Sequence, residues 1–255
     1  MTLSIALTEP QYHVNVGHVS RLMKNFGLRR LYLIRPSFDA FEAIKYSTHG
    51  KDILESASEL RSIQQLRNGF DILIGTTAIH SASRLNILRV RTSPEEMARV
   101  INESKNSRKI CLLLGRESSG LTNKELELCD MVVGIDTKTT YKTMNIAHAL
   151  AILLYEVSKL RAVKKKNTGQ RVTKKIDPAS KRDLNLLLLY LDKLAHTSNY
   201  DEHKMKLLHH SFKRILATSS PNVKDIMLIV SLFRKSLLAI DRSSERGSRP
   251  TRNKT

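Results

Sequence analysis

Residues 109–121 read KICLLLGRESSGL, an apolar run that stops at a glycine and leads into a polar loop. An uninterrupted apolar run of this length is typical of a strand buried on both faces, as in a parallel sheet covered by helices. Similar short runs are found at Leu3–Thr8, Leu31–Ile34, Asp71–Gly75 and Met131–Ile135. Because helix-forming stretches separate these runs, the sequence predicts an α/β fold built on a parallel sheet.

Capping residues mark the starts of two of the intervening helices. Ser93, Pro94 and Glu96 form one start signal, because a serine N-cap and a glutamate at the third helical position satisfy free backbone donors. Residues 122–125 form a second signal of the same kind. The other predicted helices run from Asn15 to Phe26, in pieces over residues 38–68, and from Asn145 to about Arg161.

The expected position of the ligand follows from the fold class. In an open parallel sheet, ligands bind beyond the carboxyl ends of the strands. The predicted ends here are Thr8, Gly75, Gly115 and Ile135. Site residues are therefore expected in the loops that follow these positions.

The positive charge of the 255-residue chain is concentrated in its C-terminal part. Residues 1–158 carry 20 Lys and Arg against 16 Asp and Glu, whereas residues 159–255 carry 23 against 8. Residues 159–175 alone hold eight basic side chains and no acidic one. This asymmetry favours a polyanionic partner over the alternative of a solvated basic tail. Nucleic acid is favoured over a membrane, because no basic amphipathic helix with large aromatic residues is present.

Composition also argues against several other classes of protein. No apolar run approaches the roughly 20 residues that cross a bilayer, and no secretory signal precedes the first strand, so a cytoplasmic protein is expected. Cys111 and Cys129 are expected to be reduced thiols. Neither the two cysteines nor the nine histidines show metal-ligand spacing, so no metal is predicted. With 5% aromatic residues and no Trp, contacts to nucleic acid are expected to be mainly to phosphate.

The C-terminal part is predicted to be a separate helical domain. A basic linker is expected over residues 161–177, the helical domain over 178–241 and a disordered basic tail over 242–255. Three helices are expected, from Asp177-Pro178 to about Ala195, from about Tyr200 to Ala217, and from a Ser220-Pro221 cap to about Ile240. Apolar residues of the first of these form one stripe, at Leu184, Leu187, Leu188, Leu191 and Leu194.

Three motifs together carry a resemblance to a known family. They are NVGHVSR at residues 15–21 followed by MKNFGL at 23–28, LGRESSGL at 114–121, and TMNIAHA at 143–149. In order and spacing they resemble motifs 1, 2 and 3 of the SpoU/TrmH branch of the SPOUT methyltransferases. Residues 206–236 resemble the helical extension of the TrmJ subfamily, which 2′-O-methylates a pyrimidine nucleotide at position 32 of the tRNA anticodon loop.

The resemblance implies a SPOUT methyltransferase domain at residues 1–160, folded as a trefoil knot. It implies S-adenosyl-L-methionine (AdoMet) as the cofactor, tRNA as the substrate, and a homodimer in which the partner subunit completes each site. Apolar residues of segments 16–23 and 146–157 are candidates for that interface, or equally for the core of their own subunit. The alternatives are a ribosomal RNA 2′-O-methyltransferase of the same superfamily and a catalytically silent knotted RNA-binding protein.

The site residues implied by the resemblance fall into four groups. Arg21 and Asn15 match the catalytic positions of motif 1; because a guanidinium stays protonated, Arg21 is expected to orient the 2′-hydroxyl and anchor a phosphate. Glu117 and Asn145 are expected to support the site, Asn145 as a helix cap. Cofactor contacts are expected from the knot loops, at Thr76, Thr77, Ala78, Gly115, Ile135, Lys142, Thr143 and Met144. RNA contacts are expected from basic residues, at Arg84, Lys164, Lys165, Lys166, Arg171, Lys174 and Lys175.

Overall fold

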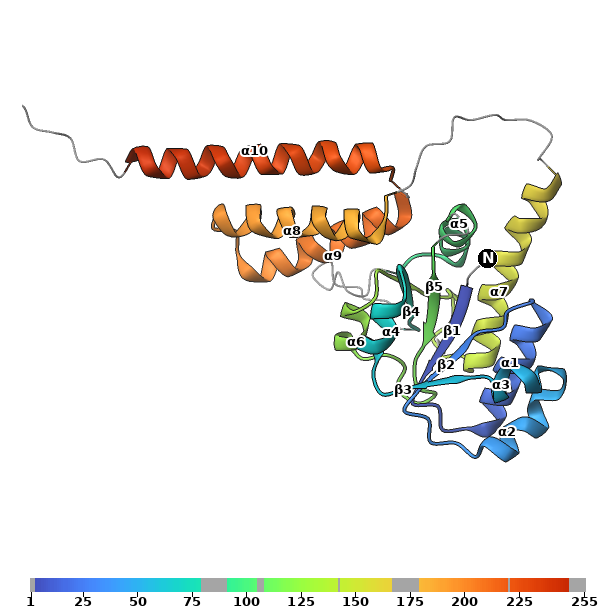
Figure 1. Cartoon of the computed structure of the whole chain (residues 1–255). Coiled ribbons are helices and arrows are strands. Elements are labelled where there is room, and N and C mark those ends of the chain that lie inside the picture. The colour runs from blue at the N-terminus through green and yellow to red at the C-terminus, as the bar shows by residue number, and fades with distance from the viewer. Residues whose placement is uncertain are drawn as a thin grey trace, which may run out of the picture. The chain divides into compact units, whose positions relative to one another are not determined.

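The computed structural model describes residues 3–78, 91–104, 108–141, 143–166, 179–219 and 221–247 (Figure 1). Contacts within the chain divide it into two compact units. The first comprises residues 1–173 with 217–219, and the second comprises residues 174–216 with 220–255. Each unit has a hydrophobic core of its own.

One parallel sheet, with strand order β3-β2-β1-β5-β4-β6, forms the centre of the first unit (Figure 1). This confirms the predicted α/β fold class. The strand β3 was not predicted, because its three residues, two of them polar, form no apolar run. The strands are β1 (Leu3–Thr8), β2 (Leu31–Ile34), β3 (Ser58–Leu60), β4 (Ile72–Thr76), β5 (Ile110–Leu114) and β6 (Met131–Val133).

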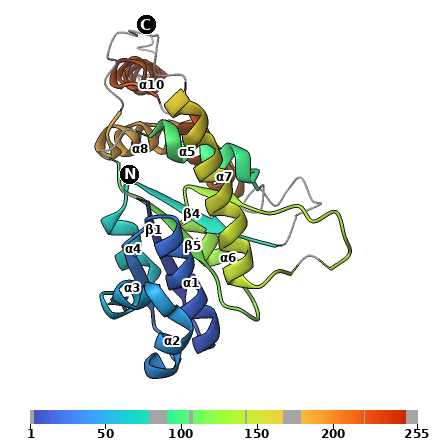
Figure 2. The same ribbon diagram turned by 90° about the vertical axis from the view of Figure 1, so that its right-hand side faces the viewer.

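Helices cover both faces of this sheet. Residues of α1, α5 and α7 share one core cluster with the sheet, and residues of α4 and α6 share the other. Figure 2 shows α1 and α7 on the same face of the sheet. The helices are α1 (His13–Asn25), α2 (Ala40–Ser47), α3 (Lys51–Glu55), α4 (Ile63–Gly69), α5 (Pro94–Glu103), α6 (Asn123–Glu127) and α7 (Ile146–Lys166), with a 3-10 turn, η1 (Thr48–Gly50).

Strand β5 has no polar residue because both of its faces are buried. Ile110, Leu112 and Leu114 belong to the core under α1, α5 and α7, whereas Cys111 and Leu113 belong to the core under α4 and α6. Alternate side chains of a strand point to opposite faces, so burial on both faces requires a continuous apolar run.

Both predicted capping boxes are present. The backbone N–H of Glu96 donates to Ser93 Oγ at the start of α5, and the Glu96 carboxylate accepts from the Ser93 N–H. Thr122 and Glu125 make the same reciprocal pair at the start of α6. These bonds satisfy backbone donors that the first helical turn leaves unpaired.

The second unit contains α8 (Lys181–Thr197), α9 (Glu202–Ser219) except its last three residues, and α10 (Val223–Gly247), packed around Leu187, Leu191 and Ile226. Its helix boundaries correct the prediction. Ser180 caps α8, in place of Asp177-Pro178, which lie outside the described residues. Asn222 Oδ1 accepts from the Asp225 N–H at the start of α10, and the predicted cap Ser220 is likewise outside the described residues.

Two predicted segment boundaries also differ from the structure. Helix α7 continues to Lys166, so the first residues of the predicted linker at 161–177 are helical. Helix α10 continues to Gly247, so residues 242–247 of the predicted disordered tail are helical as well. No helix in the described part of the chain is both long and apolar enough to cross a bilayer.

Candidate active site

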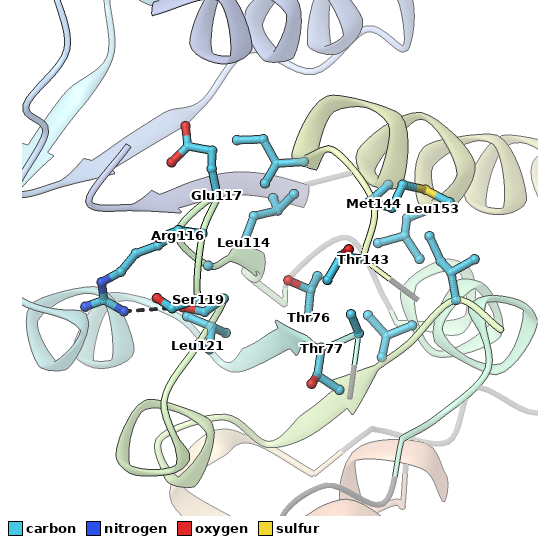
Figure 3. A pocket seen from close by; sticks show the side chains of 18 of the residues that line it. Thr76, Thr77, Leu114, Arg116, Glu117, Ser119, Leu121, Thr143, Met144 and Leu153 are labelled. Atoms are coloured by element: carbon cyan, nitrogen blue, oxygen red, sulfur yellow. Dashed lines mark hydrogen bonds between the residues drawn. The ribbon is translucent and has the colours of Figure 1, made fainter. Parts of the chain in front are cut away.

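A pocket of about 220 Å³ lies at the carboxyl ends of β4, β5 and β6 (Figure 3). These three strands are neighbours in the sheet, and their ends meet at one edge of it. The loops that follow them supply most of the wall, and the start of α7 closes the remaining side. The pocket therefore lies where a parallel sheet is expected to bind a ligand.

The lining of the pocket is mostly apolar, with a few hydroxyl groups. Leu114, Leu121 and Leu153 contribute aliphatic surface. Figure 3 shows Thr76, Thr77 and Thr143 near the middle of the pocket, and Thr76 Oγ1 donates to the carbonyl of Leu113 at 3.2 Å. An apolar cleft with a few fixed polar groups is typical of a site for a small molecule or cofactor.

Most residues predicted to hold the cofactor line this pocket. The exception is Lys142, which lies outside the described residues. The lining includes Thr76, Thr77, Ala78, Gly115, Ile135, Thr143 and Met144. The fold therefore brings together, at one pocket, residues far apart in the sequence that the resemblance assigned to the cofactor.

The loop from Gly115 to Leu121 folds back on itself, so that its two ends lie against each other. This main-chain contact is called the Gly115 crossing. The Arg116 N–H donates to the Gly120 carbonyl at 3.3 Å, and the Gly120 N–H donates back to the Arg116 carbonyl at 2.9 Å. A Cβ added to Gly115 would lie 2.3 Å from the carbonyl carbon of Gly120 and 2.4 Å from the Leu121 nitrogen. Those atoms belong to the main chain, so no side-chain rotation could relieve the contact. Gly115 is required by this crossing.

Arg116, which also lines the pocket, anchors the same loop through its guanidinium (Figure 3). Its guanidinium donates to both oxygens of Glu125, at 3.0 and 2.9 Å, and to Glu9 at 2.6 Å. Glu9 also pairs with Arg35. Glu9 and Arg35 directly follow β1 and β2, and Arg116 is the second residue after the adjacent strand β5. The ion pairs therefore join the ends of three strands to the start of α6.

The pKa values of both carboxylates are lowered within this cluster. The hydrogen bond from Arg116 is the largest influence on Glu9 and lowers its pKa below the ordinary 4.5. For Glu125, burial raises the pKa, but the hydrogen bonds from Arg116 and from Thr122 outweigh it, and the net shift is downward. Groups with lowered pKa values stabilise the folded state above their unfolded pKa and lose that contribution as the pH falls.

We expect Arg116→Met to lower the free energy of unfolding by about 2–4 kcal/mol at neutral pH, because it removes the cation paired with half-buried Glu125 and leaves Glu9 with Arg35 alone. The difference from wild type should shrink as the pH falls below 4.5, where the carboxylates become protonated. Urea denaturation at several pH values measures both effects. Lys24→Met is the matched control: it breaks the exposed Lys24–Asp52 pair, which solvent screens, and should cost far less stability. Equal losses in the two variants would contradict the anchoring role.

A chain of hydrogen bonds joins the three motifs. Asn145 Nδ2 donates to Asn15 Oδ1 at 2.7 Å, and Asn15 Nδ2 donates to Glu117 Oε1 at 3.4 Å. Glu117 Oε1 also accepts from the N–H of Tyr12, at 3.3 Å. Asn145 Oδ1 accepts from the Ala147 N–H at 2.8 Å and so caps α7. Buried Asn15 thus fixes the start of α1 against both the Gly115 loop and the start of α7.

Neither predicted catalytic residue lines the pocket: Asn15 is joined to it through its hydrogen bond to Glu117, whereas Arg21 has no such link. Arg21 is exposed on α1, about 9 Å along the helix axis from Asn15 at 1.5 Å per residue, and it is absent from the pocket lining. Within the described residues it makes no hydrogen bond or ion pair. Its guanidinium is available to a group outside its own subunit.

The predicted RNA-binding residues fall where the structure gives no side-chain positions. Arg84, Arg171, Lys174 and Lys175 lie outside the described residues. Lys164, Lys165 and Lys166 form the last turn of α7, of which the backbone alone is described. Within the described residues, no group of three or more His, Cys, Asp or Glu is placed to hold a metal ion.

Two features of the site had no role assigned from the sequence. Arg116 stands in the second motif, yet its ion pairs depend on Glu9, which is 107 positions away in the chain. Thr137 also lines the pocket, but nothing in its local sequence distinguishes it from other loop residues. The reciprocal Thr122–Glu125 cap was the only sequence signal near the Arg116 cluster.

Comparison with known proteins identifies relatives of the whole chain. The SpoU rRNA Methylase family model matches residues 2–155. The tRNA (cytidine-2′-O-)-methyltransferase TrmJ of Methanocaldococcus jannaschii is 32% identical, over 91% of this chain and 98% of that protein. The corresponding protein of Sulfolobus acidocaldarius is 28% identical, over 92% and 93%. The solved structure of TrmJ from Z. mobilis ZM4 has the same fold, with a TM-score of 0.61, 20% identity, and coverage of 92% and 99%.

Proposed function

We infer the activity from one premise: the chain belongs to the SpoU rRNA Methylase family, whose model covers residues 2–155. Relatives that match along nearly their full length are tRNA ribose 2′-O-methyltransferases. This protein is accordingly a tRNA 2′-O-methyltransferase with AdoMet as its methyl donor. The observation that carries the assignment to this chain is the pocket at the ends of β4, β5 and β6, which residues of the second and third motifs line and to which Asn15 of the first motif is hydrogen-bonded through Glu117.

The pocket suits AdoMet by its chemistry. Aliphatic side chains offer surface to an adenine ring, and the hydroxyls of Thr77 and Thr143 offer hydrogen bonds to polar parts of the cofactor. The Gly115 crossing brings bare main chain to the wall, where a Cβ would not fit. When bound, AdoMet supplies an electrophilic methyl group for in-line displacement by a ribose oxygen. We propose that Thr76, Thr77, Ala78, Gly115, Ile135, Lys142, Thr143 and Met144 hold it.

The protein's own contribution is positioning. Holding two reactants in line can lower a barrier by about 7–11 kcal/mol. The hydrogen-bonded chain of Asn145, Asn15 and Glu117 gives the pocket loops a fixed geometry for this purpose. We propose that Arg21 orients the 2′-hydroxyl and holds a substrate phosphate, which could accept the proton. Basic residues would hold the remaining phosphates, and we propose Arg84, Lys164, Lys165, Lys166, Arg171, Lys174 and Lys175 for this role.

A homodimer would reconcile the exposed position of Arg21 with a catalytic role. We propose that Arg21 of one protomer serves the pocket of its partner, because Arg21 does not line the pocket of its own chain. Leu22 is only partly buried, but the other apolar residues first considered for the interface are buried within their own subunit: Val16, Val19, Met23, Ile146, Leu150, Leu153, Leu154 and Val157. Exposed Ile152 and Tyr155 of α7 remain available. A cytoplasmic location is part of the same proposal.

The target nucleotide is proposed from the relatives that match along nearly their full length, whose names specify cytidine. We propose a pyrimidine at position 32 of the anticodon loop. Transcribed tRNA incubated with AdoMet and the full chain should gain one 2′-O-methyl group there, detectable by nuclease digestion and mass spectrometry. A tRNA with 2′-deoxyribose at that nucleotide is the control and should gain none.

Other outcomes of this experiment would point elsewhere. A methyl group on a base would exclude ribose chemistry, and methylation of ribosomal RNA fragments in place of tRNA would favour the ribosomal alternative. Absence of both AdoMet binding and turnover would favour a silent RNA-binding protein.

A further inference from the structure

Residues 91 and 92 lie along the outer edge of β6, just before α5. The Thr92 N–H donates to the Val132 carbonyl at 2.7 Å, and the Gly134 N–H donates to the Thr92 carbonyl at 3.2 Å. Strand β6 is at the end of the strand order, so these bonds pair main-chain groups on the edge of the sheet. They also fix the main chain from which the side chain of Arg91 extends.

The side chain of Arg91 packs across the main chain that follows β6. A Cβ added to Gly134 would lie 2.4 Å from Arg91 Cδ and 3.0 Å from the carbonyl oxygen of Thr77. Arg91 and Thr77 therefore approach Gly134 more closely than a side chain at that position would allow. Thr77 lines the cofactor pocket, and its N–H donates to the Val133 carbonyl at 3.0 Å. The end of β6 is thus in contact with Arg91 and with a wall of the pocket.

The guanidinium of Arg91 is directed at the next two residues of the same segment. Nη1 donates to the carbonyl of Ile135 at 3.5 Å, and Nη2 lies 3.7 Å from Oδ1 of Asp136. The side chain of Arg91 is only 11% exposed. A cation that has lost most of its water depends on such partners, so the guanidinium and the segment hold each other in place.

Ile135 is the residue through which this contact reaches the cofactor site. It lines the cofactor pocket, and it also lines a second pocket of about 420 Å³ to which Arg91 belongs. Among the described residues, Ile135 alone belongs to both linings. Residues 134–136 therefore separate the two pockets, and Arg91 supports this partition from the side of the second pocket.

We propose that Arg91 is a positioning residue of the cofactor site, which holds residues 134–136 in the arrangement that binds AdoMet. Arg91 lies outside the three motifs, so the resemblance gave it no role. It does not line the cofactor pocket and acts on it through Ile135 and Gly134. The role rests on the proposed function, because that function makes AdoMet the ligand of the pocket.

Arg91→Met tests the guanidinium, because methionine keeps an aliphatic stem over Gly134 but has no donor. Calorimetric titration of the full chain with AdoMet should show about tenfold weaker binding, since a hydrogen bond from a charged group is worth about that factor. The KM for AdoMet should rise with it, whereas kcat at saturating AdoMet and tRNA should stay within about twofold of wild type. Arg91→Lys keeps a charged donor and should bind AdoMet more tightly than Arg91→Met.

Arg99→Met is the matched control. Arg99 is an exposed arginine of α5 that lines neither pocket, so this variant should bind AdoMet like wild type. Hydrogen exchange of the cofactor-free proteins gives a readout that needs no ligand. The amides of residues 134–136 should exchange faster in Arg91→Met than in Arg99→Met, because only the first loses the contact with this segment.

Gly134→Ala is a second route to the same contact. Its methyl group would displace Cδ of Arg91, so AdoMet binding should weaken in this variant as well. Adding Arg91→Met to Gly134→Ala should then cost less affinity than Arg91→Met costs alone, because variants that break one contact are not additive. Full additivity of the two losses would contradict a shared contact and overturn the proposal.

The remaining outcomes separate this role from the function on which it rests. AdoMet affinity in Arg91→Met equal to that of wild type would overturn the positioning role alone. Equal weakening in Arg91→Lys and Arg91→Met would overturn it too, as would a loss of kcat without a loss of AdoMet affinity. Wild type that binds no AdoMet would overturn both the role and the proposed function. Wild type that binds AdoMet but leaves tRNA unmethylated would overturn the proposed function only.

Discussion

Arg21→Ala will reduce kcat for tRNA methylation by at least about 100-fold while AdoMet affinity stays close to that of wild type. Removal of one group that stabilises reacting atoms costs about that factor in other enzymes. Arg21 touches no residue of the pocket in its own chain, so its loss should not disturb the cofactor site. Single-turnover methylation at saturating AdoMet and tRNA, with calorimetry for the cofactor, measures both quantities.

Two further variants define what Arg21 supplies. Arg21→Lys keeps the charge but loses the planar fork of donors, and it should recover only part of the rate. Lys24→Ala removes a cation from the same exposed helix, and it should retain nearly full activity because Lys24 is already paired with Asp52. Full activity in Arg21→Ala would refute the assignment.

A mixed dimer decides which pocket Arg21 serves. In a dimer of one Arg21→Ala subunit and one Gly115→Ala subunit, the only intact pocket belongs to the subunit that lacks the arginine. Activity of this dimer therefore requires that the arginine of the partner act in that pocket. An inactive mixed dimer, with an active wild-type dimer prepared in the same way, would place the arginine in its own subunit's site.

Gly115→Ala will lower kcat/KM by about 100-fold or more, chiefly through weaker AdoMet binding. The added methyl group would lie 2.3 Å from a main-chain carbon of Gly120, so the loop must move by about 1 Å to admit it. That loop forms one wall of the pocket. The main-chain hydrogen bonds between Arg116 and Gly120 within the loop resist the movement. Calorimetric titration with AdoMet and steady-state kinetics test the expectation.

Gly69→Ala is the matched control for this variant. Gly69 ends α4, and a Cβ there would meet nothing within 4 Å. The control should therefore bind AdoMet and methylate tRNA like wild type. Normal AdoMet affinity in Gly115→Ala would show that the crossing can relax, contrary to the geometry of the loop.

The sequence predicted those features that depend on neighbouring residues. The apolar run of β5 and the two capping boxes are local signals, and the structure has all three. The general rule for parallel sheets then placed the ligand beyond Gly75 and Gly115. The individual pocket residues came from the resemblance of the three motifs, since small residues at strand ends have no distinctive pattern of their own. The trefoil knot and the target nucleotide stay predictions.

Features that depend on tertiary contacts could not be predicted. The short strand β3 pairs with β2 through main-chain bonds that make few demands on its side chains. The close packing of α1 against α2 depends on Gly17, where a Cβ would lie 2.5 Å from the Ala43 carbonyl oxygen, yet a glycine looks unfavourable within a helix when the sequence is considered alone. The boundaries of α8 and α10 were missed because Ser180 and Asn222 competed with nearby Pro-containing cap signals.

The sulfonium of AdoMet is a cation, and a bare arginine in the wall of its binding site would oppose it. Arg116 stands in that wall, but together with Arg35 it meets two carboxylates, so the four charges cancel. What remains is a multipole, whose potential decays faster with distance than that of a single charge. The hydrogen bonds of Arg116 therefore hold the strand ends together without a net charge that would repel the positively charged methyl donor.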